Sequence, residues 1–465
     1  MKKNIFIIIE SAKRELDCRI LLSLKLIRNN FNVVIGHKGS LYQIIDKFNP
    51  GIIFFKSLGP MNNDIIKKLK EKNFKLVACD EELLASTNIN SYLDFRIEKT
   101  NYKKLDLMFA VGEYDGVAIA KKFGESEKVK QVGNLRLDIL REPIRAIYKN
   151  EIEEIKSLYG DYFLLATQFG RVNAQNKNND FMIDSVFSLI VDGHKADSEI
   201  VRTYKSVFNY QRENLEKTIE FIKEFSKIFP EKKLLIKPHP NEKKGFWEHF
   251  IHKNNFKNIQ LIDDKKYTTN AIILAAKCVI SCNSTLLLEA HLLDQKCINY
   301  LPIKKDEKIE KDILIQASKT IRNFGDLIDQ LKKFNEFNVD TDKDKMKKYI
   351  ANYNDKKFST DLILENINNL NIILFNSLYK NKSEILKIVF FSFKVKLKTL
   401  LKQIIKYEGF TRYQKQMKKL QAHKIGDYMN KHNFNKRVYI LNNQINGGKV
   451  VIKELVPNVY KLSSE

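Results

Sequence analysis

Long uncharged stretches are missing from this sequence of 465 residues. No apolar run approaches the roughly 20 residues that a transmembrane helix needs, so no membrane-spanning segment is expected. The run Ile5–Ile9 follows two lysines, as the apolar part of a signal peptide would, but Glu10 ends it after five residues. A signal peptide needs a longer apolar region, so this run is interpreted as a first buried strand.

Cysteine is also scarce, with five residues at positions 18, 79, 278, 282 and 297. Cys278 and Cys282 could supply one pair of zinc ligands, but no second pair follows at a suitable spacing. We therefore expect reduced, buried thiols in a cytosolic protein and no bound metal. No G-x-G-x-x-G follows the first apolar run, which argues against a dinucleotide in this half, and no cofactor is expected.

The composition is that of a folded, basic protein. Hydrophobic residues make up 43% of the chain, with 30 phenylalanines, which excludes a largely disordered chain. The net charge is +25, from 81 basic and 56 acidic residues. Residues 381–424 hold twelve Lys or Arg against two acidic residues. Such an excess implies an anionic partner. An anionic membrane is favoured, because no nucleic-acid-binding motif is present and no nucleic acid is expected.

Short apolar runs alternate with helix-length segments, which predicts parallel sheets of the doubly wound α/β class. The runs in the first half are Ile5–Ile9, Val33–Ile35, Ile52–Phe55, Leu76–Val77 and Leu107–Val111. Those in the second half are Phe163–Ala166, Leu234–Ile236, Ile259–Leu261, Val279–Ile280 and Cys297–Tyr300. The predicted division is 1–138 and 155–340 for two Rossmann-like domains, 341–368 for a helix that crosses back, and 370–465 for a basic helical tail. The length suits two such domains and an appendage.

Two strand ends in the second half carry polar residues suited to anion binding. His239 stands between two prolines after the run Leu234–Ile236, so its backbone is restricted and its imidazole can donate to a phosphate. Lys237 could add positive charge. After the run Val279–Ile280, Asn283, Ser284 and Thr285 stand where a helix N-cap belongs, and free amides there bind anions. Ligands of α/β sheets bind outside the carboxyl ends of strands, so a nucleotide phosphate is expected here.

The ordered motifs resemble those of bacterial surface-polysaccharide glycosyltransferases with the two-domain GT-B architecture. The second half contains K-P-H-P at 237–240 and S-x-N-S-T-x-x-x-E at 281–289. The first half contains E-x-x-x-R-E-L-D at 10–17, and G-N-x-R-x-D follows at 133–138. Related patterns occur in capsule Kdo transferases, in the HP and SS motifs of bacterial sialyltransferases and in glycerophosphate polymerases of teichoic acid synthesis. The set is most similar to the surface carbohydrate biosynthesis proteins, and it covers about residues 1–310.

The resemblance implies an enzyme of lipopolysaccharide or capsule synthesis. It would transfer a sugar, with a CMP-activated ulosonic acid favoured, from a nucleotide donor to a lipid-linked or growing glycan. GT-B enzymes stabilise the leaving phosphate with side chains, amides and a helix dipole, so metal-independent chemistry is expected. The alternatives are a CDP-linked glycerophosphotransferase, a UDP-N-acetylglucosamine 2-epimerase-like enzyme and a non-catalytic nucleic-acid-binding or scaffold protein.

The resemblance also implies roles for individual residues. Donor nucleotide binding falls to Lys237, His239, Asn283, Ser284, Thr285 and Glu289. On the acceptor side, Glu10, Arg14 and Lys38 would bind substrate, with Arg14 on an anionic sugar. Glu15 and Asp17 are candidates for the catalytic base, and Glu113 is a third, because its loop also follows a strand. The alternative for the cluster at 10–17 is a structural network of ion pairs.

The basic tail predicts an amphipathic helix from Leu386. One apolar stripe runs through Leu386, Phe390, Phe393, Leu397, Leu400 and Ile404, at the spacing of one helix face. Lysines lie away from this stripe, as an interfacial helix on an anionic membrane requires. A second apolar set, Ile388, Phe391 and Val395, instead suits a helix packed against the folded domains. The protein is thus expected in the cytoplasm, peripheral on the inner face of the cytoplasmic membrane.

Overall fold

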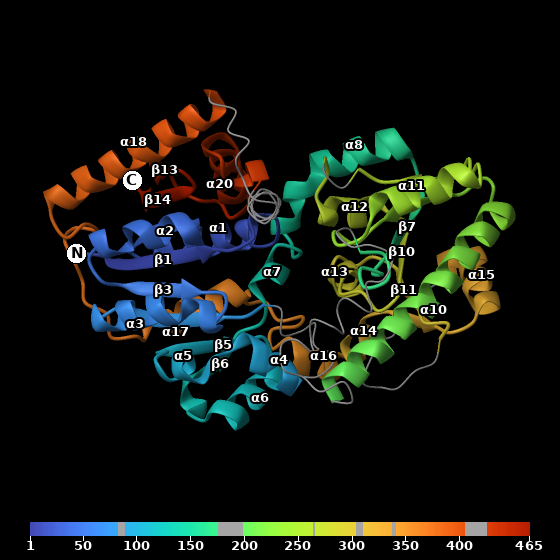
Figure 1. Cartoon of the computed structure of the whole chain (residues 1–465), viewed down its shortest axis with the longest axis horizontal. Coiled ribbons are helices and arrows are strands. Elements are labelled where there is room, and N and C mark those ends of the chain that lie inside the picture. Colours follow the sequence, from blue (N-terminus) through green and yellow to red (C-terminus); the bar gives the residue numbers. More distant parts are fainter. Residues whose placement is uncertain (82–88, 175–198, 264–265, 304–309, 337–340, 405–425) are drawn as a thin grey trace. The chain divides into compact units, whose positions relative to one another are not determined.

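The computed structural model describes residues 1–81, 89–174, 199–263, 266–303, 310–336, 341–404 and 426–465. The chain divides into two compact units. The first contains Met1–Ile147 together with Lys347–Glu465, and the second contains Tyr148–Met346 (Figure 1). Each unit has its own sheet of mainly parallel strands with helices around it. The predicted α/β class with two Rossmann-like domains is therefore confirmed.

The sheet of the first unit has eight strands in the order β13-β14-β2-β1-β3-β4-β5-β6. The central strands are buried on both faces, which explains their nearly continuous apolar sequences. Six strands are parallel: β1 (Lys3–Ile9), β2 (Phe31–His37), β3 (Ile52–Phe55), β4 (Lys75–Cys79), β5 (Leu107–Ala110) and β6 (Val129–Gln131). The main helices between them are α1 (Ala12–Arg28), α2 (Lys38–Ile44), α3 (Asn63–Glu71), α4 (Ile89–Arg96), α5 (Lys99–Lys103) and α6 (Glu113–Phe123).

The sheet of the second unit is wholly parallel, in the order β12-β11-β10-β7-β8-β9. Its strands are β7 (Tyr162–Ala166), β8 (Lys233–Lys237), β9 (Ile259–Leu261), β10 (Cys278–Ser281), β11 (Cys297–Tyr300) and β12 (Lys319–Ile321). Its longer helices are α8 (Lys149–Tyr159), α10 (Glu199–Ile228), α11 (Lys244–Lys253) and α15 (Phe324–Lys332), with the short α12 (Thr269–Ala275), α13 (Leu286–Leu292) and α14 (Asp312–Ala317).

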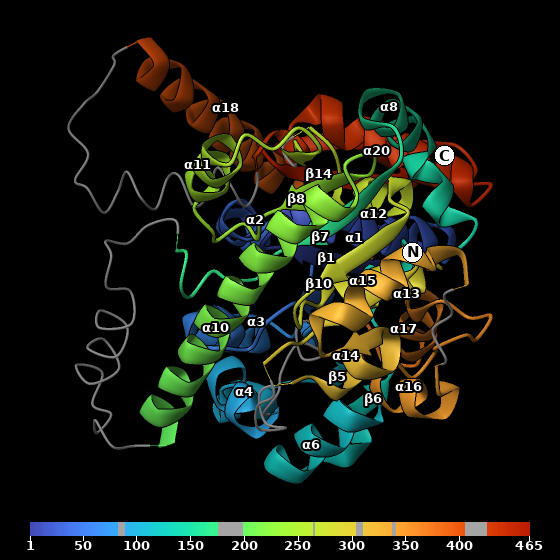
Figure 2. The same ribbon diagram turned by 90° about the vertical axis from the view of Figure 1, so that its right-hand side faces the viewer.

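The long helix α10 supplies much of the second core. Phe221, Ile222 and Phe225 are fully buried against residues of β7 and β8. Figure 2 shows α10 running obliquely along this unit. Trp247 of α11, which is the single tryptophan of the protein, is also fully buried in this core. The helix and the strands thus share one apolar layer, as expected for an α/β unit.

The motif G-N-x-R-x-D joins the returning chain to the first unit. Asn134 caps the short helix α7 (Leu135–Asp138) by accepting the Arg136 amide. The buried carboxylate of Asp138 accepts the amide hydrogens of Ser359 and Thr360, both at 2.8 Å, at the start of α17 (Ser359–Asn368). Burial raises the pKa of Asp138, and these two donors oppose the rise. This motif therefore has a structural role inside the first unit.

The C-terminal segment is more than a helical tail. It forms α18 (Lys382–Ile404) and α20 (Lys431–Gln444), as the prediction of helices implied. It also forms a hairpin of β13 (Val450–Val456) and β14 (Val459–Ser464), which sequence analysis did not predict. β14 pairs antiparallel with β2, so the hairpin extends the parallel sheet at its edge (Figure 1). The end of the chain is thus built into the first unit.

The contact between β14 and β2 generates a test of this arrangement. In Gly36→Ala, the new β carbon would lie 2.8 Å from Val459 Cγ2 and 3.0 Å from its Cα. Such overpacking should lower the free energy of unfolding by about 1–3 kcal/mol in urea titrations. Gly245→Ala on α11 is the control, because no heavy atom lies within 4 Å of its added carbon. Equal stabilities of the two variants would contradict the pairing.

Candidate functional site

His239 lies in the loop after β8, where sequence analysis predicted a residue that binds a phosphate. It is half-buried, and its Nδ1 accepts the Asn241 amide hydrogen at 3.2 Å. A neutral imidazole that accepts at Nδ1 carries its proton at Nε2. The local geometry therefore leaves His239 in the tautomer that can donate from Nε2, which is the form suited to a phosphate oxygen.

Glu242, which sequence analysis missed, holds this loop in place. Its fully buried carboxylate accepts from Thr167 Oγ1 at 2.8 Å, from the Phe169 amide at 2.9 Å and from Trp247 Nε1 at 2.9 Å. It also accepts the His239 amide hydrogen at 3.2 Å. Burial raises the pKa of Glu242, whereas these donors favour the charged form. The signal was available, because the same carboxylate completes an H-P-x-E sequence.

The loop after β10 has an unusual backbone at Asn283. Its φ is +54°, in the left-handed region that asparagine tolerates better than most residues. Its amide donates to Asn299 Oδ1 at 2.8 Å, and its own Oδ1 accepts the Lys311 amide at 3.2 Å. Asn299 is fully buried, and its Nδ2 has no hydrogen-bond partner among the described residues. Neither Asn299 nor Lys311 was among the predicted residues.

The expected helix cap after β10 differs from the prediction. α13 begins at Leu286, and Thr285 occupies its N-cap position without a capping hydrogen bond from its side chain. Instead, Ser284 Oγ accepts the Leu286 amide hydrogen at 3.3 Å. Glu289 lies half-buried on α13. Ser284 therefore performs the local capping, because its hydroxyl reaches the amide two residues ahead.

The two predicted loops flank the end of β7. Because β8 and β10 are both neighbours of β7, their ends are separated by about 10 Å, twice the usual spacing of strands. The Thr167 amide donates to the Lys237 carbonyl at 3.1 Å, and Ser281 Oγ donates to the Ala166 carbonyl at 2.5 Å. Lys237 itself is buried, at 7% exposure. Hydrogen bonds to one strand therefore position both loops.

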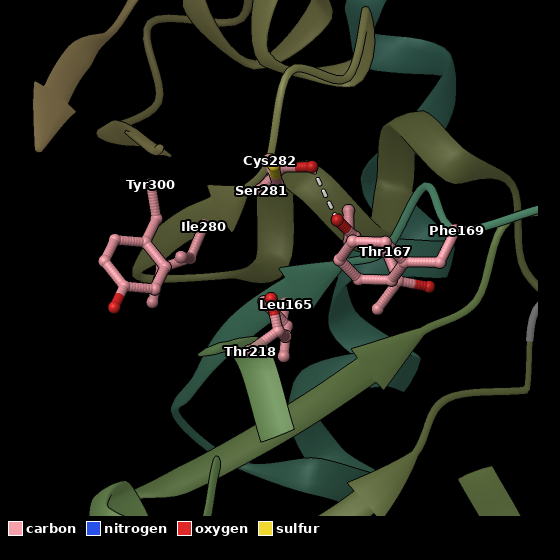
Figure 3. Close-up of a pocket in the computed structure, with 9 residues that line it drawn as sticks. Leu165, Thr167, Phe169, Thr218, Ile280, Ser281, Cys282 and Tyr300 are labelled. Atoms are coloured by element: carbon pink, nitrogen blue, oxygen red, sulfur yellow. Dashed lines mark hydrogen bonds between the residues drawn. The ribbon is translucent and has the colours of Figure 1, made fainter. Parts of the chain in front are cut away.

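A cavity of about 10 Å³ lies beside these strand ends (Figure 3). It has room for about one water molecule and is too small for a nucleotide. Its lining comes from Leu165, Ala166, Thr167, Phe169, Thr218, Ile280, Ser281, Cys282 and Tyr300. It is thus a small space among the strand ends and the residues that directly follow them.

In the first unit, the carboxyl edge of the sheet brings Glu10 and Lys38 together. Lys38 Nζ lies 3.3 Å from Glu10 Oε1, which also accepts from Ser57 Oγ at 3.2 Å. These residues follow β1, β2 and β3, three adjacent strands. Arg14 is exposed in the first turn of α1. The partly exposed Glu10–Lys38 pair offers a carboxylate and an ammonium group to a polar ligand.

Glu15 and Asp17 make contacts that favour the structural alternative. The fully buried Glu15 forms an ion pair with Lys56 at 2.7 Å and accepts the Glu10 amide at 3.0 Å. Asp17 binds Arg437 of α20, with Nη1 at 2.5 Å and 2.7 Å from its two carboxylate oxygens. A base must reach a substrate hydroxyl, and a carboxylate already held by a cation is a weak base.

Glu113 is the exposed candidate, at the first position of α6. Its neighbour Asp115 is buried and accepts the amides of Val111 and Gly112 at 2.8 and 2.7 Å. Burial raises the pKa of Asp115 to about 6. The two acidic residues of this loop therefore differ in role: Asp115 binds the backbone of the turn, and Glu113 is exposed to solvent. Glu113 therefore becomes the first of the three predicted bases.

A second buried ion pair lies behind this edge. Arg19 Nη2 is 2.6 Å from Glu81 Oε1, and both side chains are fully buried. The guanidinium also lies 4.4 Å from the centre of the Phe54 ring.

Among the described residues, no group of three or more His, Cys, Asp or Glu side chains could hold a metal ion. None of the described helices has the length and apolarity of a membrane span.

One segment of the chain is similar in sequence to a known family. Residues 203–298 match the family model of alpha-2,8-polysialyltransferases. This stretch includes the loops of His239 and Asn283. No protein of curated function matches the chain in sequence.

Two solved structures share the fold. The UDP-N-acetylglucosamine 2-epimerase of Neisseria meningitidis is 11% identical, with a TM-score of 0.51, over 79% of this chain and 100% of that one. A Listeria monocytogenes protein described as the same enzyme is 13% identical, with a TM-score of 0.50, over 79% and 96%. At this identity the likeness shows a GT-B-like fold alone. The family match over residues 203–298 supports a glycosyltransferase-like protein of surface-carbohydrate biosynthesis.

The role of Glu242 can be tested through the single tryptophan. Glu242→Gln would place an amide NH₂ among donors, so the variant should lose about 1.5–3 kcal/mol of unfolding free energy. The emission of Trp247 should change as well, because Nε1 loses its charged acceptor. Glu248→Gln is the matched control, since Glu248 is exposed on α11. If both variants behave like the wild type, Glu242 does not organise the loop.

Proposed function

We infer that the protein is a glycosyltransferase of bacterial surface-polysaccharide synthesis that takes its sugar from a nucleotide donor, with a CMP-activated ulosonic acid favoured. The observation that carries this proposal is the pair of loops beside β7. Both fall within the stretch similar to polysialyltransferases. One loop carries His239 and the other carries Asn283 and Ser284, and the strands that lead to them lie on either side of β7, about 10 Å apart.

The chemistry of this arrangement is electrostatic. When a glycosidic bond to a nucleotide breaks, negative charge develops on the leaving phosphate. Donors that are already oriented stabilise this charge without reorganisation. His239 is held by Glu242 and by the Asn241 amide, so little rotational freedom remains to be lost when it donates. The acceptor hydroxyl requires a base, and Glu113 is the candidate whose carboxylate is exposed.

The acceptor in this proposal is a lipid-linked or growing glycan at the inner face of the cytoplasmic membrane. Glu10, Lys38 and Arg14 would contact it at the carboxyl edge of the first sheet. A glycerophosphotransferase with a CDP-linked donor would use the same loops. An epimerase acting on UDP-N-acetylglucosamine is supported by the shared fold, and it ranks lower because a fold hosts many functions.

The nucleotide site is tested by calorimetry with CMP, CDP and UDP. In His239→Ala, loss of one charge-assisted hydrogen bond should weaken the preferred nucleotide about ten- to a hundredfold. His249→Ala is the control, since His249 is exposed on α11. Equal affinity in the two variants would remove His239 from the site. Preference for UDP, with interconversion of UDP-N-acetylglucosamine, would favour the epimerase.

Lys311 adds a dependence on pH. Burial lowers the pKa of its ammonium to about 8. The backbone amide of Lys311 donates to Asn283 Oδ1, which places the residue beside this loop, and a bound phosphate close to the ammonium would favour the charged form. Above pH 8 the free protein has lost this proton, and binding must take one up. Nucleotide affinity should therefore be level near pH 7 and fall up to about tenfold per pH unit above 8.

Lys311→Met should bind more weakly and show no such fall, whereas Lys319→Met, at an exposed position of β12, should keep the wild-type profile. Calorimetry at pH 8.5 in buffers of different ionisation enthalpy measures the proton uptake directly. The same pH profile in wild type and Lys311→Met would show that Lys311 does not face the phosphate.

A further inference from the structure

The outer face of α18 is an exposed apolar surface. Leu386, Phe390 and Phe393 are 70%, 68% and 62% exposed, and Val389 and Leu397 are exposed beside them. The steps between positions 386, 390, 393 and 397 keep these side chains on one side of a helix. Large apolar side chains clustered in this way mark an interaction site, whereas single exposed ones do not.

The opposite face of α18 already has its partner. Ile388 is buried in the core of the first unit together with Leu455, Val456 and Val459 of the hairpin. Phe391 is partly buried against the same core. The helix lies along the hairpin in Figure 1. Because the packing requirement is met by Ile388 and its neighbours, the outer face is not needed for folding of the first unit.

Two lysines of α18 border the exposed face, and two more lie on the hairpin against which α18 packs. Lys387 and Lys394 are exposed on α18, and of these Lys387 also contacts Glu384 at 2.7 Å. On the adjacent hairpin, Lys453 and Lys461 stand directly opposite each other. Burial and the nearby charges of Lys453 and Lys2 lower the pKa of Lys461. Like charges opposite each other on a sheet repel, and an anionic ligand would relieve the repulsion.

We propose that the outer face of α18, with its bordering lysines, docks the protein on an anionic lipid bilayer. Leu386, Phe390 and Phe393 would enter the boundary of headgroups and acyl chains, and the lysines would contact the phosphates. The lysine border favours a bilayer over a second copy of the chain, because the cores of protein interfaces are depleted of lysine.

Docking by α18 would also orient the first unit. Lys396 lies 3.3 Å from Glu454, which is opposite Tyr460, and Tyr460 pairs with Ile35 near the carboxyl end of β2. Lys396 in the second half of α18 therefore contacts a strand that is separated by β14 alone from β2, whose carboxyl end leads to Lys38. This consequence rests on the proposed function, since it brings the acceptor side close to lipid-linked glycans.

Flotation of the full-length protein with vesicles tests the proposal. The wild type should float with vesicles of phosphatidylcholine and phosphatidylglycerol at low salt, less at high salt, and not with phosphatidylcholine alone. Phe390→Ser/Phe393→Ser should reduce the bound fraction at least about tenfold. Val117→Ser/Leu158→Ser is the matched control, because these apolar residues are 56% and 60% exposed elsewhere. This control should float like the wild type.

Two further measurements separate the outcomes. The thermal unfolding midpoint and circular dichroism of the serine variant should equal those of the wild type, which shows that the fold is intact. Because neither measurement involves a nucleotide, this test stays independent of the proposed function. Light scattering should give the same mass for both proteins. The proposal would be overturned if the wild type fails to float or if the serine variant floats like the wild type. It would also be overturned if the wild type is a dimer that the serine substitutions dissociate without loss of flotation.

Discussion

The carboxylate of Asp138 determines where the C-terminal part of the chain folds. Burial of this charge is costly, and the amides of Ser359 and Thr360 at the start of α17 offset the cost, helped by the positive end of the helix dipole. Gly133, at φ +80°, makes room for Asn352, whose Oδ1 stands where a β carbon would lie. Because α17 is held against the first unit, the segments that follow it also fold onto this unit.

Buried charged side chains recur at the carboxyl ends of both sheets. The contacts of each charged group indicate whether it has a structural role or is available for chemistry. Glu15 is neutralised by Lys56, and Arg19 by Glu81. Buried pairs of this kind add little net stability, but removal of one partner is costly, so they constrain the positions of nearby loops. Glu242 does the same in the second unit with neutral donors. In the proposed function, the chemistry would fall to the more exposed groups that these residues position, above all His239 and the Glu10–Lys38 pair.

The interior of both sheets could be predicted from sequence, whereas the edges could not. Strands buried on both faces have continuous apolar runs, and all ten predicted runs form strands. β6 and β12 were missed because V-K-Q and K-T-I are short and half polar. The hairpin had a signal, since two alternating runs flank Pro457 and Asn458, and Asn458 has a φ of +65°. Sequence analysis instead assigned these residues to the basic helical tail at 370–465.

The candidate site shows the same division. His239 and Asn283 could be predicted because each directly follows a strand, so that a local pattern sufficed. Asn299 and Lys311 act through contacts with residues 16 and 28 positions away, and no local pattern reports such contacts. Asp17 shows the opposite error, because sequence analysis proposed it as a catalytic base, whereas the structure pairs it with Arg437, 420 residues along the chain. A carboxylate that resembles a base in sequence is thus an anchor for α20.

The helix α18 had two apolar faces in sequence, and periodicity alone could not decide between them. The hairpin decides it, because Leu455, Val456 and Val459 receive Ile388 and leave Phe390 and Phe393 outside. The same segment therefore closes an edge of the sheet and presents a surface bordered by lysines. A chain cut near Asn369 would lose both at once and expose the unpaired edge of β2. Folding and docking are coupled in this tail, so only substitutions on the outer face of α18 can separate them.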